Sequence, residues 1–165
     1  MSPISLNFKI YLIALALLGA ACQPSLPEEV EQAYHNLPDK VDYNFHIKPI
    51  LADRCYNCHG PDAGSRKANL RLDDEQKAFA VLASGNAAFT KGSLKNSEVI
   101  HRLISDNPSY QMPPPDSKLQ VSNEEIALIA KWIDQGAEWK THWAYQKVNK
   151  AQVPELNNAK IINEV

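Results

Sequence analysis

The stretch Cys55-Tyr56-Asn57-Cys58-His59 is the most informative part of the sequence, because it is the C-x-x-C-H signature of covalent haem attachment. Two thiols at this spacing on a helical turn can reach the two vinyl groups of one porphyrin and form thioethers. The next residue, His59, then lies under the iron and supplies an imidazole ligand. The sequence therefore predicts one covalently bound haem c, held by Cys55 and Cys58, with His59 as an axial ligand of the iron.

Other chemistries of this stretch explain less of it. A zinc site needs a fourth ligand, and the chain has no second cysteine pair. A redox-active C-x-x-C of the thioredoxin kind expects a βαβ context, which the sequence does not offer. A Cys55–Cys58 disulfide would leave His59 unexplained.

The second axial ligand is predicted to be Met112. Once Met1 leaves with a signal peptide, Met112 is the remaining methionine, and it precedes three prolines, Pro113 to Pro115. Prolines fix the backbone, so this loop can hold a thioether at the iron with little reorganisation. The alternative is a core or surface methionine beside a proline-rich turn. Other conceivable ligands, each expected instead to be solvated or hydrogen-bonded, are His35, His46, His101 and His142.

The N-terminus is predicted to be removed or anchored rather than folded. Lys9 precedes an apolar run, residues 10–21, which is too short to span a bilayer comfortably and matches a signal-peptide core. It ends in small residues before Cys22, as in a bacterial lipoprotein, so Cys22 is the expected lipidation site. With Cys55 and Cys58 taking haem, this accounts for all three cysteines. The alternative is an ordinary secretory signal with a chance cysteine.

Elsewhere the pattern predicts an all-helical domain with long loops and no convincing strand. Residues 22–40 are polar and punctuated by proline, so they are expected to form a tether, with a short helix over 28–37, and the folded core is expected to begin near Val41. Further helices are expected over 47–54, 73–83 and 97–104, with Phe45, Ile50 and Leu51 facing inward.

The last helix carries the clearest signal. Ser122 and Glu125 form a capping box at its start. One apolar stripe at helical spacing, expected to face the core, consists of Ile126, Ile129, Ala130, Ile133 and Ala137. A second apolar strip, expected to pack within the domain as well, consists of Leu128, Trp132 and Trp139.

These residues together resemble the cytochrome c domain of large exported proteins of the planctomycete and Bacteroidota type. The matching stretches, which cover about residues 41–140, are residues 41–45, 47–51, 55–62, 68–73, 112–115 and 126–137. The resemblance implies a cytochrome c-like helical fold with Cys55 and Cys58 as attachment sites and His59 and Met112 as axial ligands. It also implies that residues 141–165 are a linker toward a larger domain missing from this chain.

The domain order expected from the sequence is therefore signal peptide 1–21, tether 22–40, cytochrome c domain 41–140 and linker 141–165. We expect an electron-transfer module, lying in the cell envelope as a membrane-anchored lipoprotein, and not an enzyme by itself. The alternatives are a haem-based ligand sensor, or the haem part of a larger enzyme. The expected partner is a redox protein or the missing domain; with net charge −2 and no basic block, nucleic acid is not expected.

Overall fold

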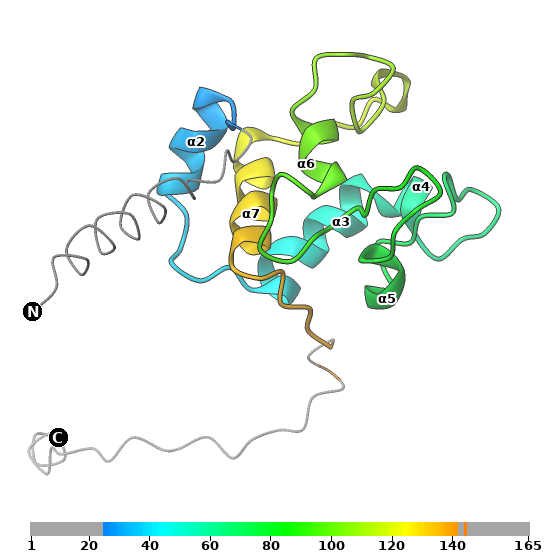
Figure 1. Cartoon of the computed structure of the whole chain (residues 1–165), viewed down its shortest axis with the longest axis horizontal. Helices are drawn as coiled ribbons and strands as arrows, with labels where there is room; N and C mark the ends of the chain where they lie inside the picture. The colour runs from blue at the N-terminus through cyan, green and yellow to red at the C-terminus, as the bar shows by residue number, and fades with distance from the viewer. Residues whose placement is uncertain (1–24, 142–143, 145–165) are drawn as a thin grey trace, which may run out of the picture.

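The computed structural model describes residues 25–141 and residue 144, and within them it is helical (Figure 1). In this part of the chain no extended strand forms, and the β-type pairs are isolated bridges at Val81–Ala87 and Ala87–Ser97. The predicted all-α class is therefore confirmed. The elements are α2 (Glu28–His35), π-helix η1 (Tyr43–Ile47), α3 (Lys48–Arg54), α4 (Tyr56–His59), α5 (Glu75–Ala78), α6 (Glu98–Leu103), the 3-10 turn η2 (Pro115–Ser117) and α7 (Asn123–Asp134).

Helix α7 is the centre of the domain and follows the prediction closely. Ser122 Oγ accepts a hydrogen bond from the Glu125 amide at 3.1 Å, and the Glu125 carboxylate accepts one from the Ser122 amide at 2.8 Å, which completes the capping box. The predicted stripe is buried along its whole length. Trp132, from the second strip, is only 1% exposed, so both strips pack inside the domain as expected.

Helix α2 packs against α7, and this corrects the predicted start of the folded core. Val30 is 1% exposed and lies in a small apolar cluster with Ile126 and Ala127. The Tyr34 hydroxyl donates to the Asp134 carboxylate at 3.0 Å. Figure 1 shows α2 lying beside α7. The packed structure therefore begins before Val41, and α2 within the predicted 22–40 tether is part of it.

The segment that leads to the C-x-x-C-H stretch begins with a π-helix rather than an α-helix. Asp42 caps η1, because its carboxylate accepts from the amides of Asn44 and Phe45 at 2.8 and 3.1 Å. Ile50 and Leu51 in α3 are buried as predicted, but Phe45 is 76% exposed, so its predicted inward position is wrong. In η1 the buried positions are Tyr43 and Ile47, and Phe45 lies between them on the exposed side.

Helix α5 is much shorter than the predicted 73–83 helix. Asp74 caps its start by accepting from the Lys77 amide at 3.2 Å, but the helix ends at Ala78. Phe79 packs against Phe89, with ring centroids 5.9 Å apart. The chain then turns at Gly85, where φ is +86°. Aromatic packing therefore outweighs the helical propensity of residues after Ala78.

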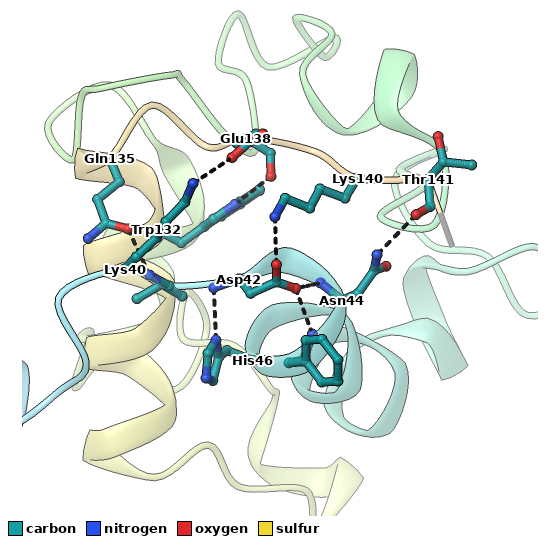
Figure 2. Close-up of polar contacts among 11 residues, drawn as sticks. Lys40, Asp42, Asn44, His46, Trp132, Gln135, Glu138, Lys140 and Thr141 are labelled. Carbon is teal, nitrogen blue, oxygen red and sulfur yellow. Dashed lines mark hydrogen bonds and ion pairs between the residues drawn. The ribbon is translucent and has the colours of Figure 1, made fainter. Parts of the chain in front are cut away.

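Hydrogen bonds and ion pairs join the segment just before α3 to the segment just after α7 (Figure 2). We call them the closing contacts: Val41 N to Gln135 Oε1 at 2.9 Å, Lys140 Nζ to Asp42 Oδ2 at 2.6 Å, and Asn44 Nδ2 to the Thr141 carbonyl at 3.0 Å. The Trp132 indole also donates to the Glu138 carbonyl at 3.0 Å. The chain that enters η1 is thus tied to the chain that leaves α7.

The predicted signal peptide and Cys22 lie outside the described residues, as does nearly all of the predicted 141–165 linker. Among the described residues, no helix has the length and apolar character needed to cross a membrane.

Candidate haem-binding site

The C-x-x-C-H stretch forms a tight helical turn at the end of α3. The Cys55 amide still donates to the Leu51 carbonyl at 2.9 Å, so the turn continues the direction of α3. The amides of Cys58 and His59 both donate to the Cys55 carbonyl, at 3.1 and 2.8 Å. The backbone therefore brings the two thiols and the imidazole onto one turn, as the spacing predicts.

The loop after His59 folds back and braces this turn. The Lys67 amide donates to the Cys58 carbonyl and the Leu72 amide to the His59 carbonyl, both at 2.8 Å. Gly60 is required at the bend, because a Cβ there would lie 2.3 Å from the Tyr56 carbonyl oxygen. The carbonyl groups at the end of α4 are therefore bonded by the loop rather than by water.

Both cysteines of the turn are free thiols, so the structure contains no Cys55–Cys58 disulfide. Burial raises the pKa of the Cys55 thiol to about 12, and the nearby Glu125 carboxylate raises it further. A thiol with this pKa stays protonated at neutral pH. This opposes a thioredoxin-like role, in which a lowered pKa supplies the reactive thiolate.

His59 presents a buried imidazole nitrogen whose hydrogen-bonding capacity is unused. Its Nδ1 atom is buried and finds no hydrogen-bond partner among the described residues. Burial lowers the pKa of His59, the positive charge of Arg102 lowers it further, and the Lys67 backbone acts in the opposite direction. The imidazole is therefore favoured in its neutral form, which is the form that binds metals.

These features fit a covalently held haem. An unpaired buried polar atom is costly, so the His59 environment is incomplete with protein atoms alone. The donors in this turn are two free thiols, which form thioethers, and one neutral imidazole, which ligates iron. A metal bound by protein side chains alone fits less well, since the described residues contain no group of three or more His, Cys, Asp or Glu side chains placed to hold one.

Met112 is connected to the same part of the molecule through α6. Its amide donates to the Arg102 carbonyl at 2.9 Å, and the residue is half-buried. Arg102 in turn is near enough to His59 for its charge to lower the imidazole pKa. The peptide bond between Met112 and Pro113 is cis. The backbone thus ties the proline-rich loop to α6, and iron ligation by Met112 stays a prediction.

Two of the other conceivable histidine ligands are engaged locally. His46 Nδ1 accepts from the Asp42 amide at 2.8 Å, next to the closing contacts (Figure 2). His101 Nε2 lies 2.8 Å from the Lys95 carbonyl. The ring of His35 lies edge-on to Tyr34, with centroids 6.1 Å apart. His142 lies outside the described residues.

Sequence reasoning missed a group of three residues beside Met112. Glu98, Arg102 and Tyr110 are joined to one another by hydrogen bonds, and Arg102 is the residue that binds the Met112 amide. One signal was present in the sequence, since an acidic residue four positions before an arginine forms a pair on one helix face. The participation of Tyr110 depends on how the loop after α6 folds back, which no local pattern reveals.

An all-helical domain whose C-x-x-C-H turn presents two free thiols and an imidazole with a buried Nδ1 atom has the side chains that hold haem in a c-type cytochrome. Comparison with protein families agrees: residues 55–116 match the family model described as planctomycete cytochrome C. This segment of the chain is therefore similar to planctomycete-type cytochrome c domains, in agreement with the predicted resemblance, and that family is one with covalently bound haem c. The matched segment begins at Cys55 and includes Met112. No curated protein and no solved structure gives a significant match.

Proposed function

We propose that this domain transfers electrons through one haem c whose iron is ligated by His59 and Met112. The observation that carries the proposal is His59 within the C-x-x-C-H turn: its Nδ1 atom is buried without a hydrogen-bond partner among the described residues, and burial lowers its pKa. A second support is that the family match extends from this turn to the Met112 loop. A histidine and methionine pair is the ligand set of electron-transferring cytochromes c and raises the reduction potential.

In this proposal each residue of the turn has a distinct task. Cys55 and Cys58 hold the haem by thioethers, so that it is not lost outside the cytoplasm. His59 would bind the iron in its neutral form, and Met112, from the loop after α6, would supply a thioether as the second ligand. The haem itself supplies the one-electron chemistry, while the protein fixes its ligands and excludes water.

The proposal includes a location and a partner. We propose that the chain is exported and anchored by lipid on Cys22, because residues 10–22 have the form of a lipoprotein signal. Its partner would be a redox protein or a larger domain that follows the 141–165 segment, with no enzymatic step in the cytochrome domain itself. A Cys22→Ala variant tests the anchor: the haem-loaded protein should move from the membrane fraction to the soluble fraction, and unchanged membrane association would contradict it.

The proposed function is tested by optical spectra of the haem-loaded protein, ferric and ferrous, with and without carbon monoxide. A c-type spectrum that carbon monoxide leaves unchanged indicates a closed six-coordinate iron and supports electron transfer. Met112→Ala should then open the site to carbon monoxide and lower the reduction potential. Gln111→Ala is the matched control, because the recorded hydrogen bond of Gln111 runs through its backbone amide to Asn107, and it should behave like the wild type.

Two results would overturn the proposal. A protein without a Soret band carries no haem, and the C-x-x-C-H turn would then need another explanation. A wild-type spectrum that carbon monoxide shifts readily, with Met112→Ala indistinguishable from it, would indicate an open iron and favour a haem-based ligand sensor.

A further inference from the structure

Three side chains form a compact hydrogen-bonded group between α6 and the Met112 loop. Glu98 Oε1 accepts from Arg102 Nε at 3.0 Å and from the Tyr110 hydroxyl at 2.9 Å. The Arg102 guanidinium lies over the Tyr110 ring, 4.4 Å from its centroid, and donates to the Tyr110 carbonyl at 3.3 Å. Each of the three residues therefore contacts both of the others.

A further contact of Glu98 ties this group to the loop before α6. The second oxygen of Glu98, Oε2, accepts from Asn86 Nδ2 at 3.0 Å, which ties the helix start to the preceding loop. The Glu98 side chain is 13% exposed and the Arg102 side chain 31% exposed, so their ion pair is partly shielded from solvent. A shielded pair is held more firmly than a solvated one, because water and salt compete less for its charges.

The group lies next to the predicted sixth ligand. Arg102 is held through its side chain by Glu98 and Tyr110, and its carbonyl accepts the Met112 amide at 2.9 Å. Tyr110 lies two positions before Met112 on the same loop, and its carbonyl and ring are both held by Arg102. The backbone on the N-terminal side of Met112 is thus fixed at two points by one guanidinium-bearing residue.

We propose that Glu98, Arg102 and Tyr110 are positioning residues that hold the Met112 thioether at the haem iron. This inference rests on the proposed histidine and methionine ligation. Arginine suits the task because its planar fork bonds two partners at once and its face stacks on an aromatic ring, which a lysine ammonium does not reproduce.

The test uses substitutions of graded severity in the haem-loaded full chain. Arg102→Lys keeps the charge and loses the fork, Arg102→Gln loses both, Glu98→Gln removes the carboxylate charge, and Tyr110→Phe removes only one hydroxyl. Lys140→Gln is the control, because it breaks an ion pair in the closing contacts, away from the Met112 loop. The readouts are the charge-transfer band of thioether-bound ferric haem, carbon monoxide binding to ferrous haem, and the reduction potential.

We expect Arg102→Lys and Glu98→Gln to weaken the charge-transfer band and to tighten carbon monoxide binding about tenfold. Tyr110→Phe should act in the same direction and more weakly. Arg102→Gln should act at least as strongly as Arg102→Lys, because it loses both the fork and the ion pair with Glu98. Lys140→Gln should match the wild type in all three readouts.

The outcomes separate this inference from the proposed function. If Met112→Ala opens the iron but Arg102→Lys, Glu98→Gln and Tyr110→Phe all keep the wild-type band and carbon monoxide affinity, the positioning role is wrong and the ligation stands. If the wild type lacks the charge-transfer band of thioether-bound ferric haem, both the Met112 ligation and the positioning role are wrong. Should Arg102→Lys fail to fold, Tyr110→Phe decides, because it retains the ring and the backbone contacts.

Discussion

Helix α7 and the single turn of α4 belong to the same small domain but differ in whether their polar groups have hydrogen-bond partners. In α7 the first amides are bonded by the Ser122–Glu125 capping box, and the buried indole of Trp132 has the Glu138 carbonyl as its partner. In α4 the backbone is bonded by the loop after it, whereas the buried Nδ1 of His59 finds no partner among the described residues and Cys55 and Cys58 are unreacted thiols. Within the described part of the chain, helix α7 has no buried side-chain polar atom without a partner, whereas the turn has two, Tyr56 OH and His59 Nδ1.

This difference separates α7, which carries much of the packing of the domain, from the C-x-x-C-H turn, which we propose binds the cofactor. Stabilising contacts concentrate on the surfaces that α7 shares with α2, η1 and α6. The turn depends on its neighbours for its backbone geometry and on a ligand for its side chains. Substitutions in α7 should therefore change stability, and substitutions in the turn should change haem content.

The largest expected effect is on the turn. Replacing both Cys55 and Cys58 with alanine should abolish covalent haem, because the thioethers have no other origin in the described chain. Mass spectrometry of the denatured protein should show a chain without haem. Ser122→Ala is the control from the scaffold and should keep the haem mass. Covalent haem on the double variant would show that attachment lies elsewhere.

The next largest effect is expected at the centre of the scaffold. Trp132 is 1% exposed and its ring packs edge-on against Phe89, with centroids 5.2 Å apart. Trp132→Ala should lower the free energy of unfolding by about 3–5 kcal/mol, through lost burial and the cavity left behind. Urea denaturation measures this. A loss of only about 0.5 kcal/mol, as at surface positions, would contradict the central place assigned to α7.

A smaller effect is expected at the start of α7. Ser122→Ala removes the acceptor of the Glu125 amide and should lower the free energy of unfolding by about 1 kcal/mol. Ser122→Asn, which keeps a capping oxygen, should recover most of this loss. If alanine and asparagine behave alike in urea denaturation, the cap does not stabilise the helix.

The smallest effect is expected at the closing contacts and depends on pH. Burial acts to raise the pKa of Asp42, but the hydrogen bond from Lys140, the Phe45 and Asn44 amides and the Lys140 charge lower it below 3.8 overall. As the pH falls, the Asp42 carboxylate is therefore protonated at a higher pH in the unfolded state than in the folded state. The stabilisation from Asp42 is present above pH 3.8 and is lost as the pH falls through its lower folded pKa.

Asp42→Asn removes this titration. The stability difference between wild type and Asp42→Asn should therefore shrink as the pH is lowered from about 5 toward 3 in urea denaturation. Asp53→Asn is a useful comparison, because Asp53 is exposed, with a side chain 71% accessible. A difference that stays constant over this pH range would mean that Asp42 contributes nothing through its charge.

Local patterns in the sequence predicted the parts of the molecule that local forces determine. The capping box at Ser122, the α7 stripe and the spacing of Cys55 and Cys58 are each contained in a few neighbouring residues, and the structure has the helix and the turn where they were expected. The early end of α5 was not predictable in this way, because it depends on Phe79 meeting Phe89.

The remaining errors have the same origin. Phe45 was expected inside from its apolar character, but in the wider π-helical turn it falls on the exposed side. The docking of Val30 on α7 and the contacts of Arg102 with Tyr110 join residues whose proximity only the folded chain creates. Sequence reasoning thus predicted the local features, the turn and the helix, and missed the contacts between residues that lie far apart in the sequence.

The closing contacts have a consequence for how this module can be joined to other chains. They place the chain before η1 and the chain after α7 side by side, with the Asn44 side chain bonded to the Thr141 carbonyl (Figure 2). A unit whose two ends leave at one place can be inserted into a surface loop of a host protein without stretching that loop. An insert of residues 40–141 would keep the closing contacts but would uncover the face of α7 on which Val30 packs, so it should be less stable than an insert of residues 25–141.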